Sequence, residues 1–221
     1  MKLFVATHNA HKLREIGQIL PGFEIVADDP KDVEENAPDF IGNALIKVRA
    51  IAARHCGEWC MADDSGLEVA ALGGAPGVRS ARYSEGKEDL CASLTSISTG
   101  EATAKRPLGS CEDAASPLSR TQMNNALLLK ILMGITDRRA NFTCAIALVD
   151  PQGVEHTVVG KCFGRIAETP SGVEGFGYDP LFIPDGHEKS FAELTAEEKN
   201  AISHRGRALA EAVKCLNVRN V

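Results

Sequence analysis

The stretch that most constrains the fold of this chain is residues 59–69, where an apolar run leads into two carboxylates, a serine and a glycine. This pattern predicts a buried strand that ends in a tight turn at Ser65 and Gly66. Because side chains alternate along a strand, Asp63 and Asp64 are expected to point in different directions. Carboxylates at the end of a strand lie at the ligand-binding edge of an α/β sheet.

Two interpretations of these carboxylates follow from their chemistry. One carboxylate can reach a metal while the other activates a water or orients a ligand. Hard carboxylate oxygens suit Mg²⁺, which keeps several waters and is completed by substrate phosphates. The simpler alternative is an Asx turn that caps the strand. Other motifs along the chain are needed to distinguish a metal site from an Asx turn.

Composition and charge narrow the class of protein. The chain has 221 residues, of which 44% are hydrophobic and 24% charged, as in an ordinary globular protein of one large domain or two lobes. The formal net charge of -6 argues against a surface that coats nucleic acid. No apolar run is long enough to span a bilayer, and the N-terminus does not have the pattern of a signal peptide. We therefore expect neither a nucleic-acid nor a membrane partner.

Cysteine usage indicates the compartment. The seven cysteines are an odd number, and no pair has the C-x-x-C spacing of a zinc or redox site. We expect a reducing, cytoplasmic location.

The first unit of the chain is predicted to be a strand over residues 2–6, a polar loop over residues 7–12 and a helix. A helix N-terminus attracts phosphate through its free N–H groups and its dipole. Thr7 and Asn9 can add side-chain hydrogen bonds, and Lys12 adds a positive charge. The glycines of a Walker A loop are missing. The alternative is an ordinary helix cap with a solvated lysine.

The next unit combines a second strand at residues 23–27, an acidic loop at 28–39 and a helix at 40–54. Asn43 and Lys47 lie four residues apart and share one face of that helix. Glu35, just before the helix, is either a metal ligand or simply favourable to the helix dipole.

The middle of the chain is less informative. Glycines and a proline give residues 70–83 an unusual backbone path, either as a structural loop or as a wall of the site. Residues 88–97 have the pattern of a helical start, and residues 98–119 resemble a surface excursion. A helix is predicted over residues 121–133.

The second half is predicted to form an antiparallel meander. Strands at residues 141–149 and 154–166 flank a turn, which makes the sheet mixed. Residues 174–180 place aromatics between glycines and before an Asp-Pro pair. Such aromatics stack on a base or simply fill the core. A short strand at residues 181–184 follows.

The C-terminal part contains a capping box and a basic cluster. Thr195 and Glu198 have the spacing of the box. Lys199, His204 and Arg205 follow, before a closing helix at residues 208–216. Arginine binds phosphate or base edges through its planar fork, although a His-Arg pair at a helix start commonly has no such role.

Together these segments closely resemble the inosine triphosphate pyrophosphatase family, which removes non-canonical purine nucleoside triphosphates. The resemblance covers nearly the whole chain and rests on six blocks in the family's order. The blocks are Thr7-x-Asn9-x-x-Lys12, residues 40–47, residues 62–69, residues 72–83, residues 175–180 and residues 197–206.

The resemblance implies a fold and an activity. It implies an α/β protein with a long mixed β-sheet and helices in two lobes around a central nucleotide cleft, all within a single domain over residues 1–221. Members hydrolyse ITP, dITP and XTP to the monophosphate and pyrophosphate with Mg²⁺, and are usually homodimers. Small-molecule nucleoside triphosphates are therefore the expected partners.

The resemblance also assigns roles to residues. Asp64 would be the general base and a metal ligand, with Asp63 supporting it, Glu35 as a second metal ligand and Lys47 as a phosphate contact. The residues expected to hold the substrate are Thr7, His8, Asn9, Ala10, His11, Lys12, Ser65, Phe176, Gly177, Tyr178, Asp179, Lys199, His204 and Arg205. Of these, residues 7–12 would hold the triphosphate, Ser65 would contact the substrate, and the last seven would hold base and sugar.

These residue types suggest a mechanism in which water attacks the α-phosphorus and pyrophosphate leaves. A carboxylate near the metal takes the proton from water, while lysines position the phosphates. Asp179, His204 and Arg205 would select a 6-oxo purine. Two alternatives are a nucleotide sensor without turnover and a pyrophosphatase for other modified nucleotides.

Three departures from the family pattern stand out. Glu35-Asn36-Ala37 replaces the family's Glu-Thr-Gly, which makes Glu34 an alternative metal ligand. Arg79 stands where the family often has an aromatic. Residues 88–120 look inserted or rewritten, and we expect activity to survive this change because the segment lies away from the motifs.

Overall fold

The fold is built on one mixed β-sheet. The computed structural model describes residues 1–30, 33–87 and 118–217. Its sheet has the order β2-β1-β3-β4-β5-β6. The strands are β1 (Lys2–Val5), β2 (Glu24–Ala27), β3 (Trp59–Val69), β4 (Arg139–Val149), β5 (Glu155–Ile166) and β6 (Phe182–Pro184). The pairs β1–β2 and β1–β3 are parallel and the remaining pairs antiparallel, so the predicted mixed α/β sheet is confirmed.

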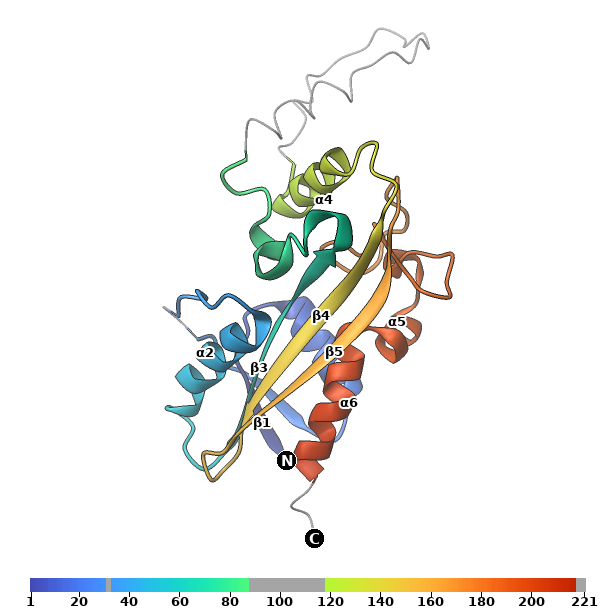
Figure 1. Cartoon of the computed structure of the whole chain (residues 1–221). Helices are drawn as coiled ribbons and strands as arrows, with labels where there is room; N and C mark the ends of the chain where they lie inside the picture. The colour runs from blue at the N-terminus through green and yellow to red at the C-terminus, as the bar shows by residue number, and fades with distance from the viewer. Residues whose placement is uncertain (31–32, 88–117, 218–221) are drawn as a thin grey trace, which may run out of the picture.

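Helices cover the sheet and its far end. The α-helices are α1 (Ala10–Ile19), α2 (Phe40–Ala52), α4 (Arg120–Ile131), α5 (Ala196–Ile202) and α6 (His204–Asn217). The 3-10 helices are η1 (Ala70–Leu72), η2 (Gly77–Arg82) and η3 (Phe191–Glu193). Figure 1 shows β3, β4 and β5 running the length of the molecule, with α4 at one end and α2 and α6 toward the other.

Alternation along β3 divides the core between two faces of the sheet. Met61 packs with Ile16 of α1 and Leu209 of α6, whereas Cys60 and Ala62 pack against α2. A third cluster, which includes Phe142, Phe182 and the leucines of α4, fills the other end of the long strands. The long strands thus connect two separately packed ends.

The predicted turn at Ser65 and Gly66 is wrong, because β3 continues through both residues to Val69. Gly66 serves close packing instead: a Cβ there would lie 2.5 Å from both the Gly77 carbonyl oxygen and Ser80 Oγ. The strand that ends near the carboxylates is β1, whose last pair joins Val5 to Met61. Asp63 and Asp64 therefore lie just beyond the end of β1, on a neighbouring strand that runs on.

Most other element predictions are confirmed with small shifts. Helix α4 begins at Arg120, where Ser119 and Gln122 form a capping box. The predicted capping box of Thr195 and Glu198 is also present. The predicted helical start at residues 88–97, and residues 98–117 of the predicted excursion, lie outside the described residues.

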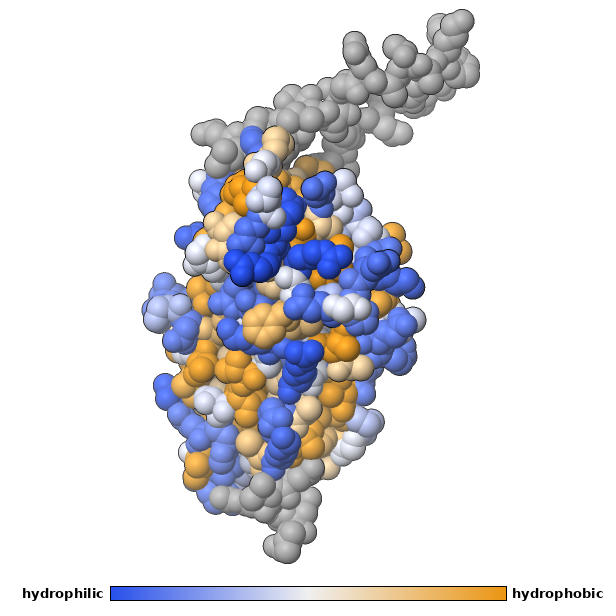
Figure 2. Space-filling view, turned by 45° about the vertical axis from the view of Figure 1, so that its right-hand side comes forward, coloured by the Kyte–Doolittle hydropathy of each residue, from blue (hydrophilic) through white to orange (hydrophobic). Residues whose placement is uncertain are grey.

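The surface carries both hydrophobic and hydrophilic side chains. Figure 2 shows hydrophobic residues spread over the half of this face nearest the C-terminus, with strongly hydrophilic ones among and above them. Within the described ranges, no helix has the length and apolar character needed to cross a membrane.

Candidate active site

Asp63 and Asp64 point to opposite faces of β3, as predicted, and each lies in its own set of charges. Asp63 faces α1 and α6 and is 1% exposed, while Asp64 faces α2 and is 7% exposed. The end of β1 beside them leads directly into the loop that starts α1. The site is therefore built where a parallel strand ends, as α/β sheets commonly arrange it.

Asp63 binds two cations. Its Oδ2 lies 3.0 Å from Lys12 Nζ and 3.0 Å from Arg205 Nη2, and the same arginine donates to Ser65 Oγ at 3.0 Å. Burial raises the pKa of the Asp63 carboxyl, but the cations of Lys12, Arg205 and Lys47 lower it further, to well below its ordinary value. Asp63 is thus a permanent anion that fixes two predicted substrate contacts.

A second layer of charges extends this cluster. Glu15 of α1 accepts from Lys199 Nζ at 2.8 Å and also pairs with Arg205. Lys199 Nζ donates to Asp179 Oδ2 at 2.8 Å. Burial lowers the pKa of Lys199, but the Asp179 and Glu15 carboxylates raise it above its ordinary value. Lys199 and Arg205 therefore remain charged although both are buried.

An aromatic ring lies over these cations. The ring centroid of Phe176 is 4.9 Å from Lys199 Nζ and 5.8 Å from Arg205 Cζ. His11 stacks on the same ring, with centroids 5.2 Å apart and planes inclined by 24°. His204 instead stacks on Phe142 of the core at 4.7 Å. Burial holds the pKa of His204 well below its ordinary value, so this imidazole is neutral.

The loop around Phe176 is held by three contacts. Asp179 Oδ2 accepts from the Phe176 backbone N–H at 2.7 Å. The Gly177 carbonyl, at a residue with φ of +62°, accepts from Asn125 Nδ2 at 3.0 Å. Tyr178 is buried and donates its hydroxyl to the Ser80 carbonyl at 3.0 Å. Tyr178 is thus a core residue whose hydroxyl already has a partner.

The Asp64 cluster contains α2 and the preceding loop. Asn43 Nδ2 donates to Asp64 Oδ2 at 3.0 Å. Lys47 Nζ lies 3.6 Å from Asp64 Oδ1 and 3.0 Å from Glu35 Oε2. This arrangement confirms that Asn43 and Lys47 share one face of their helix.

Burial sets the protonation behaviour of this second cluster. It raises the pKa of Asp64, and the Lys47 and Lys12 cations and the Asn43 amide offset the rise only in part. Burial lowers the pKa of Lys47, but the Asp64, Asp63 and Glu35 carboxylates raise it more. Two adjacent aspartates therefore have pKa values shifted in opposite directions, which separates their chemical roles.

The donor set beside Lys47 suits a hard cation. Glu35 and Asp64 both offer carboxylate oxygens to the same ammonium group, and Mg²⁺ binds through one or two carboxylates plus phosphates. Among the described residues, no group of three or more His, Cys, Asp or Glu side chains forms an all-protein metal site. Glu34 and Glu35 are both exposed, and the ion pair to Lys47 is made by Glu35.

In the loop before α1, side chains cap the backbone N–H groups next to Lys12. Asn9 caps the helix by accepting from the His11 and Lys12 backbone N–H groups at 3.0 and 3.3 Å, and Thr7 Oγ1 accepts from the Asn9 N–H. His8 is exposed and lies 3.6 Å from Asp29. Ala10 begins α1 and is exposed. The Asn9 cap agrees with the alternative of an ordinary helix cap. Lys12, however, is paired with Asp63 rather than solvated.

Three contributors were missed from the sequence: Glu15, Asn43 as a partner of Asp64, and Asn125. Glu15 lies four residues after His11 and three after Lys12, so all three fall on one side of α1. That spacing was an available signal. Nothing in the local sequence around Asn125 pointed to its contact with Gly177.

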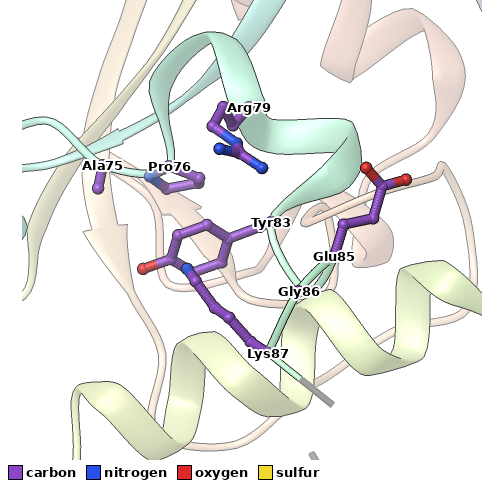
Figure 3. Close-up of a pocket in the computed structure, with 7 residues that line it drawn as sticks. All are labelled: Ala75, Pro76, Arg79, Tyr83, Glu85, Gly86 and Lys87. Carbon is purple, nitrogen blue, oxygen red and sulfur yellow. The ribbon is translucent and has the colours of Figure 1, made fainter. Parts of the chain in front are cut away.

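A separate cavity of about 500 Å³ opens near η2. Its lining residues are Ala75, Pro76, Arg79, Tyr83, Glu85, Gly86 and Lys87. Figure 3 shows the Lys87 side chain against the Tyr83 ring, where its Nζ lies 3.8 Å from the centroid. None of these residues belongs to the two aspartate clusters, so we draw no catalytic role from this cavity.

Comparison with known proteins gives a consistent result along the chain. The Ham1 family model matches residues 3–108 and 111–215. A protein from Desulforamulus reducens named dITP/XTP pyrophosphatase is 41% identical over 226 residues, covering 98% of this chain and 96% of its own length.

Solved structures agree with the fold. The Staphylococcus aureus Ham1 protein superimposes with a TM-score of 0.73 at 32% identity, and 98% of each chain is covered. A Mycobacterium abscessus structure described as a nucleoside-triphosphatase and dITP/XTP pyrophosphatase gives a TM-score of 0.64 at 42% identity, covering 96% of this chain and 99% of that one.

Proposed function

This chain belongs to the Ham1 family, and from that premise we propose that it hydrolyses non-canonical purine nucleoside triphosphates such as ITP, dITP and XTP. The products are the nucleoside monophosphate and pyrophosphate. The observation that carries the proposal is the pair of adjacent buried aspartates, one fixed by Lys12 and Arg205 and the other beside Lys47 and Glu35. Such a pair supplies a permanent anion and a base with a raised pKa from one strand.

Asp64 acts as the general base. A base works best when its pKa approaches the working pH, and burial moves Asp64 in that direction. The Asn43 amide, which donates to Oδ2 at 3.0 Å, holds the orientation of the carboxylate. Asp64 then takes a proton from the water that attacks the α-phosphorus.

Three elements hold the triphosphate. The N-terminus of α1 offers its positive dipole end, while Asn9 caps its His11 and Lys12 N–H groups. Lys12 and Lys47 add positive charges from the two sides of β3. The lysines position the phosphates and balance the charge that develops on the leaving pyrophosphate.

Mg²⁺ is the cofactor that fits this donor set. Glu35 and Asp64 would hold it, and the phosphate oxygens of the substrate would complete its shell. When bound, Mg²⁺ supplies charge neutralisation at the phosphates. Lys47, which lies 3.0 Å from Glu35 Oε2, keeps the two carboxylates together in the protein alone.

The cluster on the Asp63 side of β3 holds the base and sugar. Phe176 offers a ring on which the base can stack. The Ser65 hydroxyl is held in place by a hydrogen bond from Arg205. Arg205, Lys199 and the neutral His204 supply hydrogen-bond donors that suit the oxygen of a 6-oxo purine. A 6-amino purine would place its own N–H donors against these donors, which is a basis for rejection. Asp179 contributes by holding Lys199 and the Phe176 N–H.

The direct test is pyrophosphate release with Mg²⁺ from dITP, XTP, ATP and GTP, using the wild type and Asp64→Asn. We expect fast release from dITP and XTP only, and loss of that release in the variant. Equal hydrolysis of ATP and GTP would contradict the purine-selective role. Binding of dITP without any release would favour a sensor.

We also propose that the protein is a homodimer that uses the face of β5 opposite α6. Phe163 and Val159 on this face are 55% and 41% exposed. Lys161 lies between them, 3.7 Å from Glu68. A two-fold contact brings the same patch of each copy together, so exposed apolar side chains flanked by both a lysine and a glutamate suit such a contact.

Light scattering after gel filtration tests the homodimer. Phe163→Asp is expected to shift the protein toward the monomer. Val173→Asp is the matched control, because Val173 is 93% exposed and lies in the loop between β5 and β6, where its N–H donates to the Ala192 carbonyl. An unchanged mass for Phe163→Asp would contradict this interface. The cytoplasmic location stays a prediction.

A further inference from the structure

Two consecutive asparagines of α4 bind two different segments of the chain. Asn124 makes three hydrogen bonds to the backbone of residues 80–84, which fasten α4 to the end of η2. Asn125 Nδ2 donates instead to the Gly177 carbonyl at 3.0 Å, in the loop between β5 and β6. The first asparagine thus joins two elements of the fold, whereas the second reaches the loop that carries Phe176.

The side chain of Asn125 is only partly satisfied where it lies. Its Oδ1 is buried and accepts no hydrogen bond within the part of the chain that the structure describes. A buried carbonyl oxygen without a donor costs about as much stability as one hydrogen bond contributes, or more. The bond to Gly177 and the unpaired Oδ1 therefore offset each other, and stability alone does not explain an asparagine at this position.

Gly177 is the point at which the loop can rotate. Its φ of +62° lies in the left-handed region, which glycine adopts about as readily as negative φ. The residues on either side are held: the Phe176 N–H donates to Asp179 Oδ2 at 2.7 Å, and the buried Tyr178 is held through its hydroxyl. The bond from Asn125 fixes the peptide group that joins Gly177 to Tyr178.

We propose that Asn125 is a positioning residue for base binding, which sets the direction of the Phe176 ring by fixing the Gly177 carbonyl from α4. This inference rests on the proposed function in taking the Phe176 loop as the base-binding segment. Asp179 also holds the loop, but it pairs with Lys199, so its substitution would disturb the charged cluster as well. Asn125 is uncharged, and its substitution leaves those charges unchanged.

The positioning role predicts a loss confined to ligands that carry a base. In Asn125→Leu, KM for dITP should rise about three- to tenfold, the range expected for one hydrogen bond, while kcat stays within about twofold of the wild type. A non-hydrolysable dITP analogue should bind more weakly by the same factor. Inorganic pyrophosphate has no base, so its affinity should stay unchanged. The urea midpoint should stay or rise slightly, because the substitution also removes the unpaired Oδ1.

Steady-state kinetics, calorimetric titration and amide hydrogen exchange of the free protein test this together. Exchange should become faster at residues 176–179 in Asn125→Leu, because the loop loses its bond to α4. Asn125→Ala removes the same donor with a smaller side chain and should give the same pattern. Thr121→Leu is the control, since it places a leucine at an exposed position of the same helix and should match the wild type.

Three outcomes would overturn the proposal. They are an unchanged KM and analogue affinity in both Asn125 variants, an equal loss of affinity for pyrophosphate, and unchanged exchange at residues 176–179. A wild type that neither binds the analogue nor releases pyrophosphate would instead refute the proposed function. The exchange measurement needs no ligand, so it would then still decide whether Asn125 fixes the loop.

Discussion

The carboxylates of Asp63 and Asp64 are neighbours in sequence but lie on opposite faces of β3, with different partners. Asp63 Oδ2 receives Lys12 and Arg205 at 3.0 Å each. Asp64 has a lysine at 3.6 Å and accepts from the Asn43 amide and the Ser65 backbone N–H. The pKa of Asp63 is lowered and that of Asp64 is raised. Asp63 therefore holds Lys12 and Arg205 in place, and Asp64 is the carboxylate to which we assign the role of base.

The first prediction compares the stability of two isosteric variants. Asp63→Asn leaves Lys12 and Arg205 without their shared anion, so the free energy of unfolding should fall by about 3 kcal/mol. Asp64→Asn should keep or slightly increase stability, because a raised folded-state pKa means that the ionised carboxylate is less favourable in the folded than in the unfolded protein. Urea unfolding at pH 7 measures both.

A control and a contrary outcome sharpen this comparison. Asp137→Asn changes an exposed carboxylate that pairs with Arg139, and it should alter unfolding far less than Asp63→Asn does. Equal destabilisation by Asp63→Asn and Asp64→Asn would show that the two carboxylates do not divide their roles as we propose.

The second prediction concerns the pH dependence of turnover. The base must be deprotonated, so kcat/KM should fall as pH drops through the raised pKa of Asp64. Lys47 lowers the pKa of Asp64. Lys47→Met should therefore move the acidic limb of the pH profile of kcat/KM to higher pH, by about one unit or more. Lys214→Met makes the same charge change at an exposed Glu211 pair and should leave the limb in place. A limb that stays fixed in Lys47→Met would argue against Asp64 as the titrating base.

The third prediction distinguishes the two candidate metal ligands in the loop before α2. Glu35→Gln should raise the Mg²⁺ concentration needed for half-maximal activity about tenfold or more, since a carboxylate ligand loses its charge. Glu34→Gln makes the same change at the neighbouring exposed position and should have little effect. Chelation of the metal should abolish activity in both variants, and restored Mg²⁺ should recover it. If Glu34→Gln raised the required Mg²⁺ concentration more than Glu35→Gln does, Glu34 would be the metal ligand instead.

The sequence predicted what depends on neighbours along the chain. The opposite directions of Asp63 and Asp64 follow from strand alternation, and the shared face of Asn43 and Lys47 follows from helical spacing. The pairing of these carboxylates with Lys12 and Lys47 depends instead on how α1 and α2 pack against β3. The mixed sheet also followed from the hairpin that joins β4 to β5.

Contacts between distant segments were not predictable in the same way. Glu15 binds Lys199 and Arg205, which lie 184 and 190 residues further along the chain. The turn expected at Gly66 failed for the same reason. A glycine after a serine is typical of a turn, but here the missing Cβ makes room for η2, a separate element. Only the folded packing distinguishes the two uses of glycine.

The last prediction tests that packing at Gly66. In Gly66→Ala, the new Cβ would lie 2.5 Å from the Gly77 carbonyl oxygen and 2.9 Å from Phe40 Cε1. Because the carbonyl is backbone, η2 must shift, and we expect a loss of about 1–3 kcal/mol in the free energy of unfolding. The shift also reaches the substrate loop, since the Ser80 carbonyl of η2 accepts from the Tyr178 hydroxyl. KM for dITP should therefore rise as well. Gly17→Ala is the matched control: it adds a methyl group within α1 where no atom lies within 4 Å, and should stabilise the protein by about 0.5–1 kcal/mol. A Gly66→Ala protein as stable as the wild type would mean that β3 and η2 do not pack as closely as described.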